Sequence, residues 1–229
     1  GVITLTLFWI IENRETYPML ETRLFTHNKL FGFSNLAALI NYTATSGIVF
    51  FLSLYLQKIQ GLSPRDAGAV IIAQPAVMAL FSPVVGRLSD KIQPRYFATL
   101  GMGMCSVGLF GISFFTATTP LWSIVLILVW EGLGFAFFSS PNMNTIMSSV
   151  DKSRYGQASG TASSMRIFGQ IAGMTVVTFF FAFYFGDSTV TGVDDTVFLT
   201  AMKWGFITFA LISLAGIYFS FTRGNMERQ

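Results

Sequence analysis

Glu131 is an acid in the middle of a long apolar stretch, Leu121–Ser140. A carboxylate is costly to bury away from water, so we expect Glu131 to face other helices, to be protonated or to have a polar partner. Because burial favours the neutral form of a carboxylic acid, such a group is suited to binding and releasing a proton. A structural hydrogen bond to a neighbouring helix is the alternative, and the sequence leaves both open.

Arg166 is a second charge within or beside an apolar stretch, and Gln170 follows it by one helical turn. It could pair with Glu131 or bind an anionic group. The alternative is that its side chain snorkels to the aqueous boundary of a membrane. Gly169 and Gly173 have the small-x-x-x-small spacing that permits close approach of two helices.

A short segment between two apolar stretches, 86–95, gathers Gly86, Arg87, Asp90, Lys91 and Arg95. Asp90 is placed to pair with a nearby cation or with a helix N-terminus. The alternative is a short basic loop on the cytoplasmic side of a membrane, with no further role.

The composition is that of a membrane protein. Of 229 residues, 52% are hydrophobic and 11% are charged, where a soluble domain has roughly a quarter charged. One core could not bury so much apolar surface, and lipid is the solvent that accepts it. The net charge of +3 is too small and too scattered to indicate nucleic acid. One cysteine, Cys105, and one histidine, His27, leave no basis for a metal site or an internal disulfide.

The apolar stretches predict an all-α integral membrane fold with six spanning helices. Each stretch has the length that a helix needs to cross roughly 30 Å of hydrocarbon. The predicted spans are Leu30–Leu56, Ala67–Val85, Tyr96–Phe115, Leu121–Ser140, Ala162–Phe185 and Val197–Phe221. Before the second span, Ser63, Pro64 and Asp66 form the signature of a helix N-terminus.

Lysine and arginine positions predict the orientation. If the segment before the first span is cytoplasmic, the opposite side receives only Lys58, Arg65 and Lys203 of the 14 basic residues. The cytoplasmic segments then hold Arg14, Arg23, Lys29, Arg87, Lys91, Arg95, Lys152, Arg154, Arg223 and Arg228. This distribution follows the positive-inside rule, so we expect the N-terminal linker and the C-terminus in the cytoplasm of a multi-pass cell (plasma or inner) membrane protein.

The chain divides into three predicted segments. Gly1–Ile11 is apolar but shorter than a span, and it lacks the basic residues of a signal peptide. We therefore expect 1–29 to be the end of a truncated transmembrane helix with a cytoplasmic linker. Residues 30–222 then form the six-helix unit, and 223–229 form a cytoplasmic tail.

Polar residues are unevenly distributed among the spans. The first, second, fourth and fifth carry amides or charges near their middles, whereas the third and sixth carry only small polar residues. The candidates for lining a central cavity are Asn41, Thr45, Gln74, Glu131, Phe135, Arg166 and Gln170. Tyr42, Trp130, Phe135 and Phe138 could hold a cation or a flat ring, with lipid contact as the alternative for these aromatic residues.

Several motifs, in order, resemble the major facilitator superfamily. The loop with Gly86, Asp90, Lys91 and Arg95 is similar to its G-x-x-x-D-[RK]-x-G-[RK]-[RK] signature, although Gln93 replaces the usual Gly and Pro94 a basic residue. Other motifs resemble the C-terminal half of its fourteen-helix drug:proton antiporter branch: Leu54-Tyr55-Leu56-Gln57, Gly61-Leu62-Ser63-Pro64, Ala67-Gly68, Pro83 ahead of Gly86-Arg87, and Gly156-Gln157-Ala158-Ser159-Gly160 before Arg166, Gly169 and Gly173.

The resemblance implies a six-helix half-bundle of two three-helix repeats, in which the first, second, fourth and fifth helices line a cavity. It implies that Asp90 is the acid of a conformational latch, supported by Gly86, Arg87, Lys91 and Arg95. The expected partners are the lipid bilayer, the N-terminal half of the same transporter and a small-molecule substrate. A proton gradient, and no cofactor, would supply the energy.

The expected function is proton-coupled efflux of lipophilic or cationic drug-like compounds by alternating access, with Glu131 as the proton-coupling candidate. A transporter of an organic anion or metabolite is the nearest alternative, and Arg166 facing the cavity would favour it. A non-transporting sensor or assembly protein is a further alternative. A membrane enzyme is disfavoured because no histidine, cysteine or paired carboxylates converge in the spans.

Overall fold

The computed structural model describes residue 25 and residues 28–186 and 192–224, and this part of the chain is helical, with no strand. In chain order the helices are α3 (Lys29–Thr45), α4 (Gly47–Lys58), α5 (Pro64–Ile71), α6 (Ala73–Ser89), α7 (Pro94–Ile112), α8 (Leu121–Ser148), a 3-10 turn (Lys152–Arg154), α9 (Tyr155–Phe185) and α10 (Asp195–Thr222). The predicted all-α class is confirmed.

The helices fall on the six predicted spans. Five are long and apolar enough to cross a membrane: Lys29–Lys58, Pro64–Ser89, Leu121–Ser148, Lys152–Phe185 and Asp195–Thr222. The remaining predicted span, the third in chain order, is occupied by α7, which has 19 residues. Both α8 and α9 extend beyond the expected spans, because the helices continue through the polar residues that follow Ser140 and precede Ala162.

The first two spans are each divided near their middles, which the apolar pattern alone does not predict. Pro75 in the first turn of α6 has no backbone N–H, so it cannot bond the carbonyl of Ile71 and the helix is interrupted there. Between α3 and α4, the hydroxyls of Thr43, Thr45 and Ser46 bond the carbonyls of Leu39, Asn41 and Thr43. Such back-bonding bends helices.

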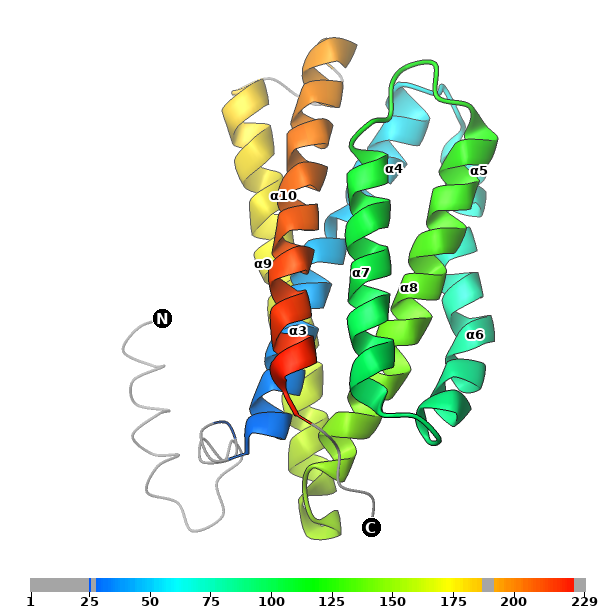
Figure 1. The fold of residues 1–229 in the computed structure, drawn as a ribbon. Coiled ribbons are helices and arrows are strands. Elements are labelled where there is room, and N and C mark those ends of the chain that lie inside the picture. The colour runs from blue at the N-terminus through cyan, green and yellow to red at the C-terminus, as the bar shows by residue number, and fades with distance from the viewer. Residues whose placement is uncertain (1–24, 26–27, 187–191, 225–229) are drawn as a thin grey trace.

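The helices stand side by side and form one bundle (Figure 1). α8 packs against both α6 and α7, and α10 packs against α7, α3 and α9. The largest core cluster joins α4, α7 and α10 through side chains such as Phe51, Leu109 and Phe206. This is the six-helix half-bundle of two repeats, α3–α7 and α8–α10, that the sequence predicts.

α9 and α3 approach closely through glycine. A Cβ on Gly169 would lie 2.6 Å from the carbonyl oxygen of Leu39, and one on Gly173 would collide with the carbonyl of Thr43. The close approach that the glycine spacing predicts is confirmed at these two positions. Gly160, on the same helix, has open space where its Cβ would be.

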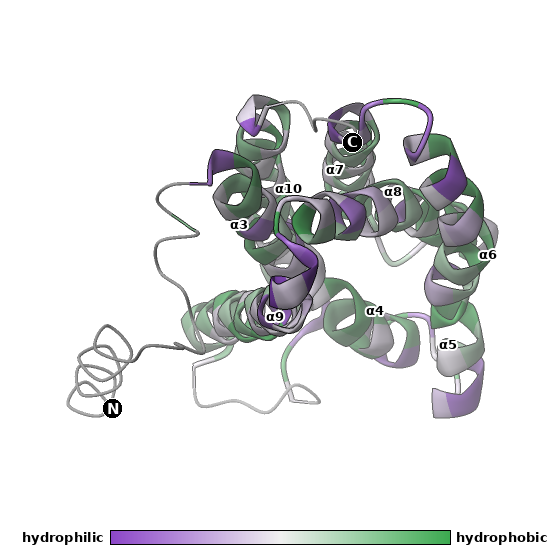
Figure 2. Cartoon of the chain, turned by 90° about the horizontal axis from the view of Figure 1, so that it is seen from below, coloured by the Kyte–Doolittle hydropathy of each residue, from purple (hydrophilic) through white to green (hydrophobic). Residues whose placement is uncertain are grey.

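The outside of the bundle is apolar. Large hydrophobic side chains such as Leu80, Trp122, Phe183 and Tyr218 are mostly exposed. Viewed along the helices in Figure 2, hydrophobic residues cover most of the bundle, and strongly hydrophilic segments lie mainly at helix ends. The chain is a multi-pass membrane protein, because only lipid stabilises such a surface.

The connections define two ends of the bundle. The α6–α7 loop and the end of α10 lie together at the lower end in Figure 1, whereas the α7–α8 loop lies at the upper end. The predicted truncated helix Gly1–Ile11 and most of the linker and the tail fall outside the described residues.

Candidate transport cavities

The larger of two adjoining cavities has a volume of about 440 Å³. We call it the Phe135 cavity. Gln74 and Gln170 place amides on walls that are otherwise formed mainly by apolar side chains and by small hydroxyls. Its lining comprises Tyr42, Thr45, Ser46, Val49, Gln74, Pro75, Met78, Phe135, Gln170 and Met174. A mostly apolar wall with a few polar groups is typical of a small-molecule site.

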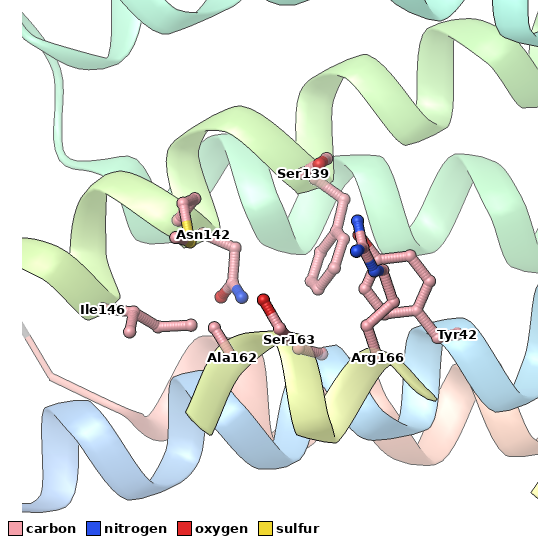
Figure 3. A pocket seen from close by; sticks show the side chains of 10 residues that line it. Tyr42, Ser139, Asn142, Ile146, Ala162, Ser163 and Arg166 are labelled. Carbon is pink, nitrogen blue, oxygen red and sulfur yellow. The ribbon is translucent and has the colours of Figure 1, made fainter. Parts of the chain in front are cut away.

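The smaller cavity, of about 210 Å³, adjoins the first through Tyr42. We call it the Arg166 cavity. Figure 3 shows Asn142 of α8 and Ser163 of α9 extending toward each other across it, with Arg166 reaching from α9 toward α8. Its lining comprises Ala38, Tyr42, Phe138, Ser139, Asn142, Met143, Ile146, Ala162, Ser163 and Arg166.

The walls of both cavities come from the first, second, fourth and fifth spans, and α7 and α10 contribute no lining residue to either. This agrees with the uneven distribution of polar residues in the sequence. Of the predicted cavity residues, Thr45, Gln74, Phe135 and Gln170 come together in the Phe135 cavity, and Arg166 lies in the other.

Glu131 lies off both cavity walls. Its side chain is fully buried and turned toward α7, where a Cβ on Gly108 would collide with the carboxylate. Neither carboxylate oxygen of Glu131 has a hydrogen-bond partner within the described residues. Glu131 is about 40° around α8 from Phe135, at 100° per residue. That small offset sends one side chain into the α7–α8 contact and the other into the cavity.

Asn41 also lies off the cavity walls, although its neighbour Tyr42 lines both. It is fully buried, and its amide nitrogen and oxygen have no hydrogen-bond partner within the described residues. Trp130 is half exposed, and its indole N–H donates to the carbonyl of Met104 on α7 at 2.8 Å. Trp130 therefore faces outward, as the lipid-contact alternative requires.

Arg87 in the last turn of α6, and Asp90 and Lys91 in the loop that follows, are exposed. The backbone N–H of Asp90 caps α6 by bonding the carbonyl of Gly86, and its side chain makes no ion pair within the described part of the chain. A Cβ on Gly86 would lie 2.8 Å from the hydroxyl of Ser140, so this glycine lets α6 approach α8. The carboxylate of Asp90, the predicted latch acid, is therefore available to pair with a cation outside the described residues.

Arg95 follows the loop and packs its guanidinium over aromatic rings. The group lies 4.7 Å from the ring centre of Tyr96 and 5.5 Å from that of Phe221. It also donates to the hydroxyl of Tyr96 at 2.8 Å. Arg95 therefore connects the start of α7 with α10 through its contact with Phe221.

Arg223, assigned from the sequence to the cytoplasmic tail, belongs to the bundle. It is 2% exposed, and its Nη1 donates to Oδ1 of Asn142 at 2.6 Å and to the hydroxyl of Ser34 at 3.3 Å. Its Nε and Nη2 have no partner in the described residues. Burial, and then repulsion from Arg95, lower the pKa of Arg223 to about 10.

Three polar residues of the Arg166 cavity escaped the sequence analysis: Ser139, Asn142 and Ser163. Ser139 and Asn142 follow Phe135 by four and seven residues, which places them near one face of α8. That spacing was available in the sequence for Ser139, whereas Asn142 lies beyond Ser140, where the predicted span ended. Ser163 and Arg166 are three apart on α9, and the same rule applies to them.

Comparisons with known proteins agree with this architecture. The sequence model of the Major Facilitator Superfamily matches residues 22–228. The riboflavin transporter RibZ of Clostridioides difficile is 29% identical over 185 residues, which is 80% of this chain and 40% of RibZ. A tetracycline resistance determinant of Streptomyces rimosus is 32% identical over 66% of this chain and 44% of its own. The multidrug efflux pump LfrA of Mycolicibacterium smegmatis is 29% identical over 80% of this chain and 36% of its own.

The chain spans less than half the length of these relatives. The family match covers almost the whole chain, including the loop at 86–95 and all the helices that the structure describes. It also agrees with the expectation of a transporter rather than an enzyme. The chain belongs to the major facilitator superfamily.

Proposed function

We propose that the complete protein is a secondary active transporter that exports lipophilic, drug-like compounds by alternating access, driven by a proton gradient. The observation that carries the proposal is the Phe135 cavity, whose mostly apolar wall with the amides of Gln74 and Gln170 suits a lipophilic molecule with few polar groups. The names of the relatives, a multidrug efflux pump and a tetracycline resistance determinant, support export.

The N-terminal half of the transporter is the proposed partner of the exposed faces of the second and fifth spans. Only 11% of the most hydrophobic stretch of Pro64–Ser89 and 17% of that of Lys152–Phe185 are buried, against 39–50% in the other three candidate spans. On α9 the exposed residues include Ser163, Arg166 and Gln170. Polar groups at that depth face protein or a watery cavity in membrane proteins, which supports a substrate path between two halves.

Glu131 is the proposed proton carrier. It is fully buried, and it has no basic partner within the described residues. Glu131 lies in the α7–α8 contact and not on a cavity wall. Gain or loss of its proton would therefore change the packing of α7 against α8, and the carboxyl group itself would not contact the substrate. Its position therefore supports coupling through conformation, and it gives no support to a preference for cationic substrates.

The test uses inside-out membrane vesicles that contain the complete protein and a lipophilic dye. With an imposed proton gradient, the unaltered protein should accumulate dye, and Glu131→Gln should lose accumulation while keeping gradient-independent dye exchange. Asp194→Asn removes an exposed acid and serves as the matched control. Undiminished accumulation by Glu131→Gln would remove Glu131 from the coupling role.

A further inference from the structure

The Arg166 cavity differs from its neighbour in chemistry. Besides Arg166, its wall carries the polar side chains of Tyr42, Ser139, Asn142 and Ser163. The Phe135 cavity has no charged residue on its wall. Among the described residues that line the two cavities, Arg166 is therefore the single charged one, and its charge is positive.

Arg166 has no counter-ion within the described part of the chain. It makes no ion pair or hydrogen bond there, and Glu131, the acid within the fourth span, is turned toward Gly108 of α7. Since a cation at this depth in a membrane protein pairs with an anion or faces water, the free guanidinium is available to a ligand.

A second guanidinium lies behind the same wall. Arg223 donates from Nη1 to Asn142, which lines the cavity, while the amide of Asn142 donates to the carbonyl of Ser34 at 3.1 Å. Arg223 is fully buried, and two of its donor nitrogens lack partners in the described residues. A buried, unneutralised cation strengthens the positive potential of the wall, because fields are screened weakly away from water.

The two cavities adjoin at Tyr42. Tyr42 lines both, and its ring centre lies 6.1 Å from that of Phe135. An extended molecule could therefore place a ring system against Tyr42 and Phe135 while its polar end reaches Arg166.

We infer that the Arg166 cavity binds the carboxylate or another anionic group of the transported compound, while the apolar rings of the same compound occupy the Phe135 cavity. The planar guanidinium of Arg166 can donate two parallel hydrogen bonds to a carboxylate, and Ser139 and Ser163 add hydroxyl donors. The substrate class is thus an aromatic amphiphile with an anionic or zwitterionic end. This inference rests on the transport function proposed above.

A matched dye pair tests it: a xanthene dye with a free carboxylate, and the methyl ester of the same dye. Vesicles containing the complete protein should transport both. Arg166→Gln should raise the KM for the acid by about tenfold or more, the loss of about 1.4 kcal/mol or more expected when a charge-assisted hydrogen bond is removed. The KM for the ester should change little, and Arg166→Lys should restore part of the preference.

Lys203→Gln provides the control, because it removes one positive charge from an exposed position outside both cavities. Equal effects of Arg166→Gln on acid and ester, or transport of the ester alone by the unaltered protein, would overturn the anionic subsite and leave the transport function standing. Transport of neither dye, with the protein folded in the membrane, would count against the proposed function itself.

Discussion

Arg223, the residue that follows the end of α10, donates a hydrogen bond of 2.6 Å to Oδ1 of Asn142 on α8. The contact joins the last helix to the wall of the Arg166 cavity. It is a charge-assisted bond, and the Arg223 side chain is almost fully buried.

Asn142→Leu should destabilise the protein by about 1.5–3 kcal/mol, because it leaves the buried Arg223 without its main acceptor. The double variant Asn142→Leu with Arg223→Met should be more stable than Asn142→Leu alone, since the orphaned charge is then absent. Thermal unfolding of the complete protein in detergent measures both. Strictly additive effects of the two substitutions would show that the residues are not coupled in this way.

The α3–α9 contact should be sensitive to one added methyl group. Gly169→Ala and Gly173→Ala should each destabilise the bundle by about 1–3 kcal/mol, because their Cβ atoms would meet the backbone of α3. Gly160→Ala is the control, and it should be neutral or stabilise by up to about 1 kcal/mol through helix propensity. Equal unfolding temperatures for all three variants would contradict the close contact.

Gly108→Ala should impair proton coupling although it replaces no titratable residue. The added methyl would occupy the space of the Glu131 carboxylate and displace it. We expect the gradient-driven transport rate to fall about tenfold, which corresponds to about 1.4 kcal/mol on a barrier. Gly103→Ala on the same helix has its first neighbour at 4.0 Å and should transport normally. A normal gradient-driven transport rate in Gly108→Ala would show that the position of the Glu131 carboxylate does not matter for proton coupling.

The predicted orientation has a direct chemical test. Asp90 and Asp194 are both exposed, and they lie in connections at opposite ends of the bundle. Asp90→Cys should react with a membrane-impermeant maleimide only from the cytoplasmic side, and Asp194→Cys only from the other side, in a background without other reactive cysteines. Labelling of both from one side would refute the topology.

The fold follows from the sequence to a large extent, because each span is marked by a long apolar run with few charges. The broken first and second spans are harder to predict. Pro75 points to the interruption of the second, but hydroxyls such as Thr43 and Ser46 bond the backbone in many unbroken helices.

The candidate site is only partly predictable. Spacing on a helix identifies the faces that carry Arg166 and Gln170, but it cannot separate the directions of Glu131 and Phe135. That difference depends on the missing side chain at Gly108, on a helix distant in sequence. In the sequence, Arg223 is simply a basic residue near the C-terminus. Its burial depends on Asn142 and Ser34, which are both remote in the chain.

The most direct measurement of the central claim is dye movement in proteoliposomes that contain only the complete protein. With a proton gradient imposed across the membrane, the account predicts dye accumulation against its own concentration gradient, abolished by a protonophore and absent from protein-free liposomes. Dye movement that is the same with and without the gradient, or the same as in protein-free liposomes, would contradict proton-driven transport.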